Sequence, residues 1–326
     1  MILVTGATGF IGSHLVDELI RRRCQVRILV RNSFDSRHSL KGVETSLGDI
    51  TDNASLISAL KKIDVVFHLA AAINLSTESM ERYREINVLG TENLFKAIKA
   101  SDTRIKRFVF CSSVGVFGPL DSLPANEETR CNPVNFYELS KYEAEKSVRA
   151  IGAADHIPVS IIRPSWVYGP NDKRTFKLFR AINKNRFLII GDGKTLVHPV
   201  YVSDVVQGLI KCAFEENGEN NTYIIAGDQS VSLNSLVETI EKALKKKVPK
   251  THVPVSVVKM IANGFEKIYG PLHRIPPISN RRLDFFLKNQ AFDISKARRD
   301  IGYRPEVTLE TGIQKTIAWY RDHDWL

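Results

Sequence analysis

Cysteine is scarce in this chain, and its few residues lie far apart. The four are Cys24, Cys111, Cys131 and Cys212, and none of them forms a Cys-x-x-Cys pair. This spacing argues against a zinc site and against a disulfide framework, so we expect no bound metal. Cys24 and Cys111 lie in or beside apolar segments, and we expect them to be buried free thiols. A reducing compartment fits this pattern, and we expect a cytoplasmic protein.

Long apolar runs are also missing. No stretch approaches the length that a membrane-spanning helix needs, and the first residues read as a strand rather than a signal peptide. There is no internal repeat and no low-complexity segment. The 326 residues are 43% hydrophobic, which is enough for a large core that we expect to be split between two lobes.

Acidic residues are in deficit, with 36 Asp and Glu against 46 Lys and Arg, a net charge of +10. Such a balance would suit a polyanionic partner. However, the only dense basic run, at Lys245–Lys247 and Lys250, reads as a helix end, where cations complement the helix dipole. There is no nucleic-acid-binding motif. We therefore favour a phosphate-bearing cofactor and a solvated lysine surface over a nucleic-acid partner.

The first fourteen residues are the stretch around which the chain is organised. Residues 2–4 form a continuous apolar strand, three glycines follow at Gly6, Gly9 and Gly12, and an amphipathic helix starts near residue 10. This layout places backbone N–H groups and a helix N-terminus against a pyrophosphate. The first glycine allows a tight turn, the second leaves room for phosphate, and the third lets helix and strand pack closely. The stretch predicts a dinucleotide site.

Strand and helix patterns then alternate, which predicts an α/β fold with a doubly wound parallel sheet of the Rossmann type. Strands are expected at 26–30, 43–47, 64–69, 107–111, 158–162 and 222–226, and helices near 10–22, 53–61, 79–100 and 135–151. We assign residues 1–168 plus about 198–228 to the cofactor-binding domain. Residues 169–197 plus about 229–326 should form a smaller α/β substrate lobe. An amphipathic stretch at 255–268 reads as core packing, or else as a lid over the cleft.

Several motifs occur in one order along nearly the whole chain. They are the turn Gly-x-x-Gly-x-x-Gly, Ser112-Ser113 at a strand end, Tyr137-x-x-x-Lys141, and Arg163-Pro-Ser-Trp-Val-Tyr-Gly-Pro170. In this order and spacing they resemble the extended branch of the short-chain dehydrogenase/reductase superfamily. Tyr137 and Lys141 are four residues apart and share a helix face. Ala144 and Val148 continue that face, so we expect it to be buried rather than solvated.

The resemblance implies a catalytic set. Tyr137 would be the general acid/base, Lys141 would hold the ribose and tune Tyr137, and Ser113 would bond the substrate oxygen, with Ser112 the weaker choice. Tyrosine alone is a poor base, with a pKa of about 10. We expect the lysine and an oxidised nicotinamide to lower this pKa by about 3 units. A surface Tyr/Lys pair is the alternative interpretation of this spacing taken alone.

The resemblance and the strand ends together give the predicted cofactor contacts. These are Gly6, Thr8, Gly9, Phe10, Ile11, Gly12, Arg31, Asp49, Ile50, Leu69, Ala70, Ala71, Asn87, Tyr137, Lys141, Pro164 and Val167. No acid stands at position 31 or 32 after the second strand, and Asp35 is farther along. Arg31 instead suits the extra phosphate of NADP, so NADP is favoured and NAD is the alternative. Asp49 could equally be a loop cap.

Two polar residues near these contacts have competing interpretations. His68, inside an apolar strand, reads as a packed histidine rather than a catalytic one. Asn87 is unfavourable inside a helix, which suggests either a hydrogen-bonding role near the site or a tolerated polar position.

The implied activity is hydride transfer between nicotinamide and a secondary alcohol or ketone, alicyclic or sugar-like. Relatives that are 4,6-dehydratases carry Thr-Asp-Glu where this chain has Ser112-Ser113-Val114. Nucleotide-sugar epimerases usually carry Arg-Asp-Phe, where this chain has Val197-His198-Pro199. The motifs look closest to the 3β-hydroxysteroid dehydrogenase and dihydroflavonol reductase branch. An epimerase with tightly bound NAD is the rival, and a non-catalytic NAD(P)-sensing protein is a second alternative.

A few expectations remain for substrate and assembly. The substrate candidates are Ser112, Ser113, Val114, His198 and Arg282. By resemblance, the helices near 79–100 and 135–151 would pack in a homodimer. We expect a small-molecule substrate, no nucleic-acid partner and no membrane span.

Overall fold

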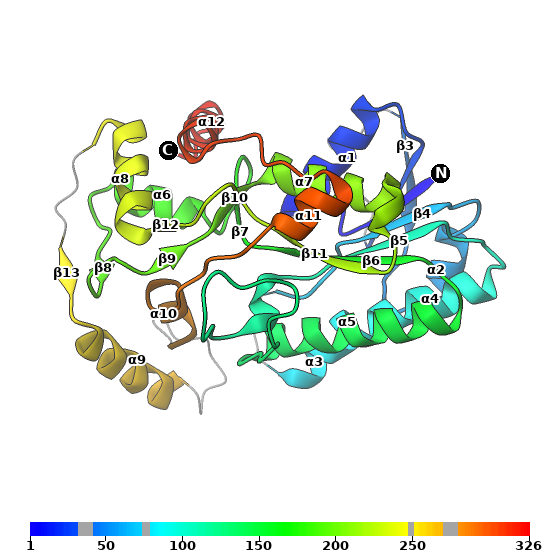
Figure 1. Cartoon of the computed structure of the whole chain (residues 1–326), viewed down its shortest axis with the longest axis horizontal. Helices are drawn as coiled ribbons and strands as arrows, with labels where there is room; N and C mark the ends of the chain where they lie inside the picture. The colour runs from blue at the N-terminus through cyan, green and yellow to red at the C-terminus, as the bar shows by residue number, and fades with distance from the viewer. Residues whose placement is uncertain (32–41, 74–78, 247–250, 270–279) are drawn as a thin grey trace.

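A computed structural model describes the chain except for residues 32–41, 74–78, 247–250 and 270–279, and except for the side chains of residues 266, 268, 280–282 and 284. Asp35, Lys247, Lys250 and the side chain of Arg282 therefore lie outside the described residues. Figure 1 shows the chain with the N-terminal elements on one side and α8, α9 and β13 on the other.

A seven-stranded parallel sheet is the centre of the fold, with strand order β11-β6-β5-β4-β1-β2-β3. The strands are β1 Ile2–Thr5, β2 Val26–Val30, β3 Val43–Leu47, β4 Val65–His68, β5 Arg107–Cys111, β6 Val159–Pro164 and β11 Asn221–Ile225. The order reverses between β1 and β4, as in a doubly wound sheet. The predicted fold class is confirmed, and the strand expected at 222–226 is the edge strand β11.

Helices cover both faces of this sheet (Figure 1). One face carries α1 Phe10–Arg21 and α7 Val202–Phe214, which pack against each other. The other face carries α2 Asn53–Ala59, α4 Gly90–Ala100 and α5 Phe136–Ala154. Before α4 the chain runs through α3 Met80–Arg84 and a π-helical segment η2, Glu85–Leu89. The 3₁₀ turn η3, Val114–Phe117, follows β5.

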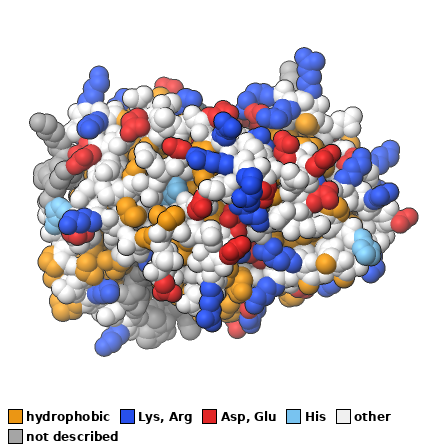
Figure 2. Space-filling view, viewed as in Figure 1, with side chains coloured by type: hydrophobic (Ala, Val, Ile, Leu, Met, Phe, Trp, Pro, Cys, Tyr) orange, Lys and Arg blue, Asp and Glu red, His pale blue; other side chains and the backbone are white. Residues whose placement is uncertain are grey.

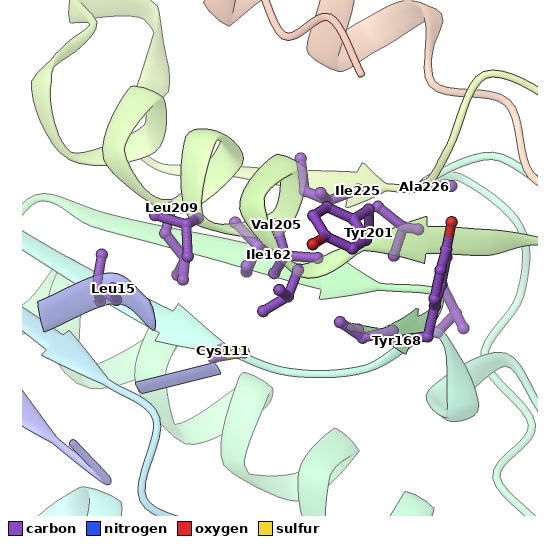
Figure 3. Close-up of a cluster of buried hydrophobic side chains, with 14 of the residues drawn as sticks. Leu15, Cys111, Ile162, Tyr168, Tyr201, Val205, Leu209, Ile225 and Ala226 are labelled. Carbon is purple, nitrogen blue, oxygen red and sulfur yellow. The ribbon is translucent and has the colours of Figure 1, made fainter. Parts of the chain in front are cut away.

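The strands alternate their side chains between two separate cores, because successive residues of a strand point to opposite faces. Val4 and Ile162 meet α1 and α7, whereas Leu3 and Ile161 meet the α2–α4–α5 layer. Figure 3 shows the first core, where Leu15 of α1 and Leu209 of α7 lie over the sheet. This double burial explains why the strands read as continuous apolar runs.

The rest of the chain forms three two-stranded sheets and several helices. The strands pair as β7 Trp166–Tyr168 with β10 Pro199–Tyr201, β8 Ile189–Ile190 with β13 His252–Val253, and β9 Leu196–Val197 with β12 Val231–Ser232. The helices are α6 Phe176–Asn183, η4 Glu216–Gly218, α8 Leu233–Leu244, α9 Val255–Tyr269, α10 Asn280–Leu287, α11 Ser295–Ile301 and α12 Leu309–Asp322. Although α11 lies in the segment assigned to the substrate lobe, it packs against β11 of the large sheet. The domain boundaries stay a prediction.

Helix α9 packs as part of a small satellite core. Its Val258 and Ala262 are buried against Leu283 of α10, with Val253 of β13 beside them. No described residue of α9 lines the large cleft introduced below. The core-packing interpretation of 255–268 therefore holds, and the lid interpretation is not supported.

The cysteines and the surface agree in part with expectation. Cys111 is buried as predicted, whereas Cys24 is only half-buried, and within the described chain all four thiols are free. Figure 2 shows Lys and Arg interspersed with Asp and Glu on the face viewed, rather than gathered into one basic stripe. Of the helices described, none is long and apolar enough to cross a bilayer.

Candidate active site

The glycine turn between β1 and α1 is as tight as its sequence suggests. Gly6 has a φ of +70°, a conformation that side chains rarely adopt. A Cβ on Gly12 would lie 2.1 Å from the Gly6 carbonyl oxygen, so helix and turn touch backbone to backbone here. Helix α1 begins after Gly9 without a side-chain cap. Its first N–H groups thus have no side-chain acceptor, and the positive end of the helix dipole is suited to an anion.

A cleft of about 1190 Å³ opens beside this turn. Sixteen of the seventeen predicted cofactor contacts line it: Gly6, Thr8, Gly9, Phe10, Ile11, Gly12, Arg31, Asp49, Ile50, Leu69, Ala70, Ala71, Tyr137, Lys141, Pro164 and Val167. Ser112 and Ser113 line the same cleft. Residues from β1, β2, β4, β5, α5 and β6 meet here because the carboxyl ends of parallel strands share one edge of the sheet.

Helix α5 presents Tyr137 and Lys141 to the cleft. Asn135 caps the helix by accepting from the Glu138 N–H at 3.0 Å, which sets its first turn just before Tyr137. Lys141 is only 2% exposed, and its Nζ lies 4.0 Å from the centroid of the Phe110 ring. A buried ammonium over an aromatic face is a cation–π contact. The Tyr/Lys pair therefore faces the cleft and not bulk water.

Burial changes the pKa values of this pair in opposite directions. It lowers the pKa of Lys141 to about 8 and raises the pKa of Tyr137 to about 12. A side-chain hydrogen bond with Ser113 and the charge of Arg174 both oppose the rise for Tyr137. In the chain without a cofactor, desolvation of Tyr137 outweighs the nearby positive charge of Arg174. The lowering expected with an oxidised nicotinamide bound stays a prediction.

The side chain of Ser113, just after β5, is held by the backbone of the turn that follows. Its Oγ accepts from the Gly115 N–H at 3.1 Å, which caps the 3₁₀ turn η3. Ser113 also lines the cleft together with Tyr137, and it opposes the rise of the Tyr137 pKa. Ser112 Oγ, by contrast, is buried and has no hydrogen-bond partner among the described residues.

A buried ion pair supports α5 behind Lys141. Glu145, one turn farther along the helix, accepts from Arg163 Nε at 2.9 Å and from its Nη2 at 2.7 Å. Both side chains are less than 5% exposed. A bidentate pair of this kind fixes orientation as well as adding attraction. It joins α5 to β6, the strand that carries Pro164 to the cleft wall.

Asn87 does not line the cleft, although it was predicted as a cofactor contact. Its side chain instead clamps Ala72, a residue that does line it. Asn87 Oδ1 accepts from the Ala72 N–H at 2.7 Å, and Nδ2 donates to Ala72 O at 3.1 Å and to Ser140 Oγ at 2.9 Å. The side chain thus links the loop after β4 to α5, one step away from the cleft.

His68 is a packed strand histidine, as predicted. Thr91 Oγ1 donates to the Asn87 carbonyl, so His68 Nε2 must donate to Thr91 Oγ1, at 2.9 Å. Nδ1 therefore accepts from Thr5 Oγ1, at 2.6 Å. Burial lowers the pKa of His68 to about 3, which keeps the ring neutral. This chain of hydrogen bonds ties β1 and β4 to α4.

Two predicted substrate residues do not lie in the cleft. His198 is buried, with Nε2 donating to the Gly227 carbonyl at 3.0 Å and Nδ1 accepting from the Phe292 N–H at 3.0 Å. Both ring nitrogens are used within the fold, so its assignment to substrate is wrong. Val114 is buried in the first core and does not line the cleft either. Val114 lies in the turn η3, and its side chain packs in the first core, whereas Ser113 lines the cleft.

Asp49 serves as a loop cap and lines the cleft at the same time. Its Oδ1 accepts from the Thr51 N–H at 2.9 Å and from Thr51 Oγ1 at 2.8 Å. Arg31, at the end of β2, lines the same end of the cleft with its side chain exposed. A cation is thus placed where the adenosine end of a dinucleotide would meet the second strand.

Several cleft residues were missed from sequence. They are Thr5, Arg82, Ser165, Trp166, Asp172, Arg174 and Phe285. The cluster Asn-Asp-Lys-Arg at 171–174 directly follows the Gly169-Pro170 turn, and that local signal could have identified it. Phe285, on α10, comes from more than a hundred residues away and carries no local signal.

Several known proteins are similar to this chain over nearly its whole length. UDP-glucose 4-epimerase of Vibrio cholerae is 31% identical over 97% of this chain and 94% of its own length. The 3β-hydroxysteroid dehydrogenase/Δ5→4-isomerase of Mycobacterium tuberculosis is 30% identical over 98% of this chain and 90% of its own length. The structure of MoeE5 with UDP-glucose and NAD matches 99% of both chains at 27% identity, with a TM-score of 0.78.

The sequence model of the NAD dependent epimerase/dehydratase family matches residues 2–226. That span runs from β1 through the Tyr/Lys pair to β11, which is the whole parallel sheet. The chain therefore belongs to the NAD dependent epimerase/dehydratase family and is an enzyme of the extended short-chain dehydrogenase/reductase type.

Proposed function

We propose that this enzyme transfers hydride between a nicotinamide dinucleotide and a carbon bearing a secondary hydroxyl or keto group, with Tyr137 as the acid/base. The observation that carries the proposal is one cleft lined by the glycine turn, Ser113, Tyr137 and Lys141 together. A bound nicotinamide would supply or accept the hydride. The chain's own part is to bind, to align and to move one proton.

The residues fit such a cofactor. The backbone approach of Gly6 and Gly12 and the uncapped start of α1 suit a pyrophosphate. Lys141 is placed to hold a ribose hydroxyl, and small residues at Ala70 and Ala71 leave room beside the cofactor.

The proton chemistry follows from the pKa values. With a pKa raised to about 12, Tyr137 keeps its proton at neutral pH and can donate it to a carbonyl oxygen as charge develops there. Ser113, which lines the same cleft as Tyr137, can hold that oxygen. In the opposite direction Tyr137 must lose its proton, and Lys141 favours this only while it is itself charged. The chain alone therefore prepares the reduction direction.

The decisive test is Tyr137→Phe, with Tyr142→Phe on the same helix as the matched control. The variant should bind NAD or NADP within a few-fold of wild type and lose at least about 10²-fold in turnover, the usual contribution of a positioned acid/base. Cofactor binding is measured by calorimetry and turnover by nicotinamide absorbance and product analysis. Turnover at the wild-type rate in Tyr137→Phe would refute the assignment.

Epimerisation is the second candidate, favoured by the Vibrio cholerae relative and by MoeE5 with UDP-glucose and NAD. It would use the same proton transfer twice, once in each direction. An epimerase would give an isomer of the substrate with no net change in nicotinamide absorbance. A dehydrogenase changes that absorbance with each turnover, and a sensing protein would do neither.

For the cofactor we propose NADP over NAD, on the basis of Arg31. The solved relative MoeE5 holds NAD, so the preference needs a direct measurement. Arg31→Ala should weaken NADP binding about tenfold and leave NAD within about twofold, as expected for one charge-assisted phosphate contact. Tighter binding of NAD than NADP by the wild type would contradict the preference.

A further inference from the structure

Three residues that line the cleft each carry a buried side-chain oxygen with no hydrogen-bond partner among the described residues. These oxygens are Ser112 Oγ, Ser165 Oγ and Asp172 Oδ2. Buried polar groups are nearly always paired, and a carboxylate oxygen left unpaired is the most costly of the three. Asp172 is only 1% exposed, so bulk water does not readily satisfy it.

The other atoms of Asp172 are firmly held. Its Oδ1 accepts from the Arg174 backbone N–H at 2.9 Å and from Arg174 Nε at 3.3 Å. Its backbone carbonyl accepts from the Tyr320 hydroxyl of α12 at 3.0 Å. Asp172 is therefore held at its carboxylate by Arg174 and at its backbone by α12, while Oδ2 remains unused. An atom held in this way is preorganised for a ligand.

The surroundings indicate what that ligand offers. Arg174 and Lys173 line the cleft beside Asp172, and Arg174 is close enough to act electrostatically on Tyr137. Trp166 and Phe285, with ring centroids 5.7 Å apart, form an apolar surface in the same cleft. An acceptor, two cations and an aromatic surface together fit a hydroxyl-rich ring attached to an anionic group better than a hydrocarbon skeleton.

We propose that Asp172 is a specificity-determining residue whose Oδ2 accepts a hydrogen bond from a hydroxyl of a sugar-like substrate, while its Oδ1 holds Arg174 at the cleft wall. This rests on the proposed function, because it concerns the substrate end of the same cleft. Asp172 takes no part in the proton transfer itself, and it discriminates by leaving an unpaired charge when the substrate lacks the hydroxyl.

The test is Asp172→Asn in the full-length protein loaded with NAD or NADP, whichever binds more tightly. Asp192→Asn is the matched control, because Asp192 also accepts from the N–H two residues on, Lys194, at 2.9 Å, but its side chain is 67% exposed and does not line the cleft. The probes are UDP-glucose and UDP-glucuronic acid, with a 3β-hydroxysteroid as the apolar comparison. Affinities are measured by calorimetry.

We expect Asp172→Asn to weaken the nucleotide sugars about 10- to 100-fold, the range for a lost hydrogen bond to a charged group, with cofactor affinity unchanged. Asp192→Asn should change neither. Equal sugar affinities in Asp172→Asn and wild type would overturn the proposal. So would binding of the steroid in place of both sugars, or binding of none of the three.

Two further measurements keep the result interpretable. If Asp172→Asn fails to fold, Tyr320→Phe removes one of the two donors to the Asp172 carbonyl, leaves the Phe176 N–H, and should weaken sugar binding about two- to fivefold. Turnover abolished by Tyr137→Phe together with unchanged sugar binding in Asp172→Asn would keep the proposed function and reject this inference. Loss of dinucleotide binding by the wild type would instead reject the proposed function.

Discussion

Burial of Lys141 removes its ammonium group from water, and this desolvation lowers the stability of the folded protein. Its unfolded pKa is 10.5 and burial lowers the folded value to about 8. Between these values the unfolded chain holds a proton that the folded chain has released, so folding stability rises with pH across that window. Below pH 8 the full cost of the buried ammonium is present. Buried charged residues that destabilise the folded protein in this way are typical of functional sites.

Lys141→Met should therefore stabilise the cofactor-free protein at pH 7 by roughly 1–3 kcal/mol, with the gain fading between pH 8 and 10.5. It should also abolish turnover. Urea unfolding at pH 7 and at pH 10 measures the first effect. Lys146→Met is the control, since Lys146 lies 4.3 Å from the Tyr142 ring on the same helix but is exposed. A variant less stable than wild type at pH 7 would show that the ammonium is compensated.

At the scale of single residues, the sequence indicated which residues could form a site, but not how burial changes their pKa values. Tyr137, Lys141 and Ser113 were predicted from the order of the motifs and the resemblance that it carries, and the three residues line one cleft. Burial raises the pKa of Tyr137 in the chain without a cofactor, and residue spacing does not report burial. Asp172 belongs to the polar cluster at 171–174, but its burial depends on contacts distant in sequence, such as that with Tyr320 of α12.

In the turn between β1 and α1, Gly9 and Gly12 differ in how much space surrounds them. A Cβ at Gly12 would lie 2.1 Å from a backbone oxygen, whereas a Cβ at Gly9 would lie 3.1 Å from that same Gly6 oxygen. The first distance requires backbone to move, and the second requires only a small adjustment. Gly12 thus serves packing within the protein, and Gly9 is free to serve the cofactor.

We expect Gly12→Ala to destabilise the protein by about 1–3 kcal/mol, as overpacking does, and to lose dinucleotide binding. Gly9→Ala should fold with stability close to that of wild type and still bind the dinucleotide more weakly. Thermal unfolding and calorimetric titration with NAD and NADP measure the two effects on both variants. Equal stability losses in the two variants would contradict this division of roles.

The elements themselves were largely predictable. The six strands and four helices expected along the first two thirds of the chain all occur, with ends shifted by a few residues. What the periodicity did not indicate is that the helix expected at 79–100 contains the π-helical segment η2. That segment carries Asn87, whose amide clamps Ala72. A residue unfavourable for helix propensity was thus a local sign of irregular helix geometry.

At the scale of the whole molecule, the C-terminal helix α12 supports the part of the cleft wall that contains Asp172. Tyr320 is fully buried, packs against Phe176 and Phe179, and donates to the Asp172 carbonyl. The last residues of the chain therefore hold a loop that lies about 150 residues earlier in sequence. The aromatic residues of α12 therefore support this part of the cleft wall.

Tyr320→Phe should cost about 1 kcal/mol of stability, because it removes one buried hydrogen bond and leaves the Asp172 carbonyl with fewer donors. The cofactor half of the cleft should be unaffected, so NAD or NADP affinity should stay within about twofold of wild type. Urea unfolding and calorimetry test both. A large loss of dinucleotide affinity would mean that α12 supports the whole cleft and not one end of it.

The predicted homodimer can also be tested at this scale. Leu89 and Phe136 are 48% and 43% exposed at the ends of η2 and at the start of α5, the helical layer expected to form the interface. Light scattering on the purified protein would give the mass. A protein that remains monomeric at high concentration would contradict the predicted homodimer.

The sequence by itself determined the parallel sheet, the glycine turn and the Tyr/Lys helix face, because each depends on local periodicity or on residues a few positions apart. Only the tertiary structure decided which polar groups lose water and which find partners. His198 lies outside the cleft because both of its ring nitrogens bond to Gly227 and Phe292. Asp172 keeps one oxygen without a hydrogen-bond partner among the described residues. Those outcomes depend on segments distant in sequence, whose meeting no local pattern records.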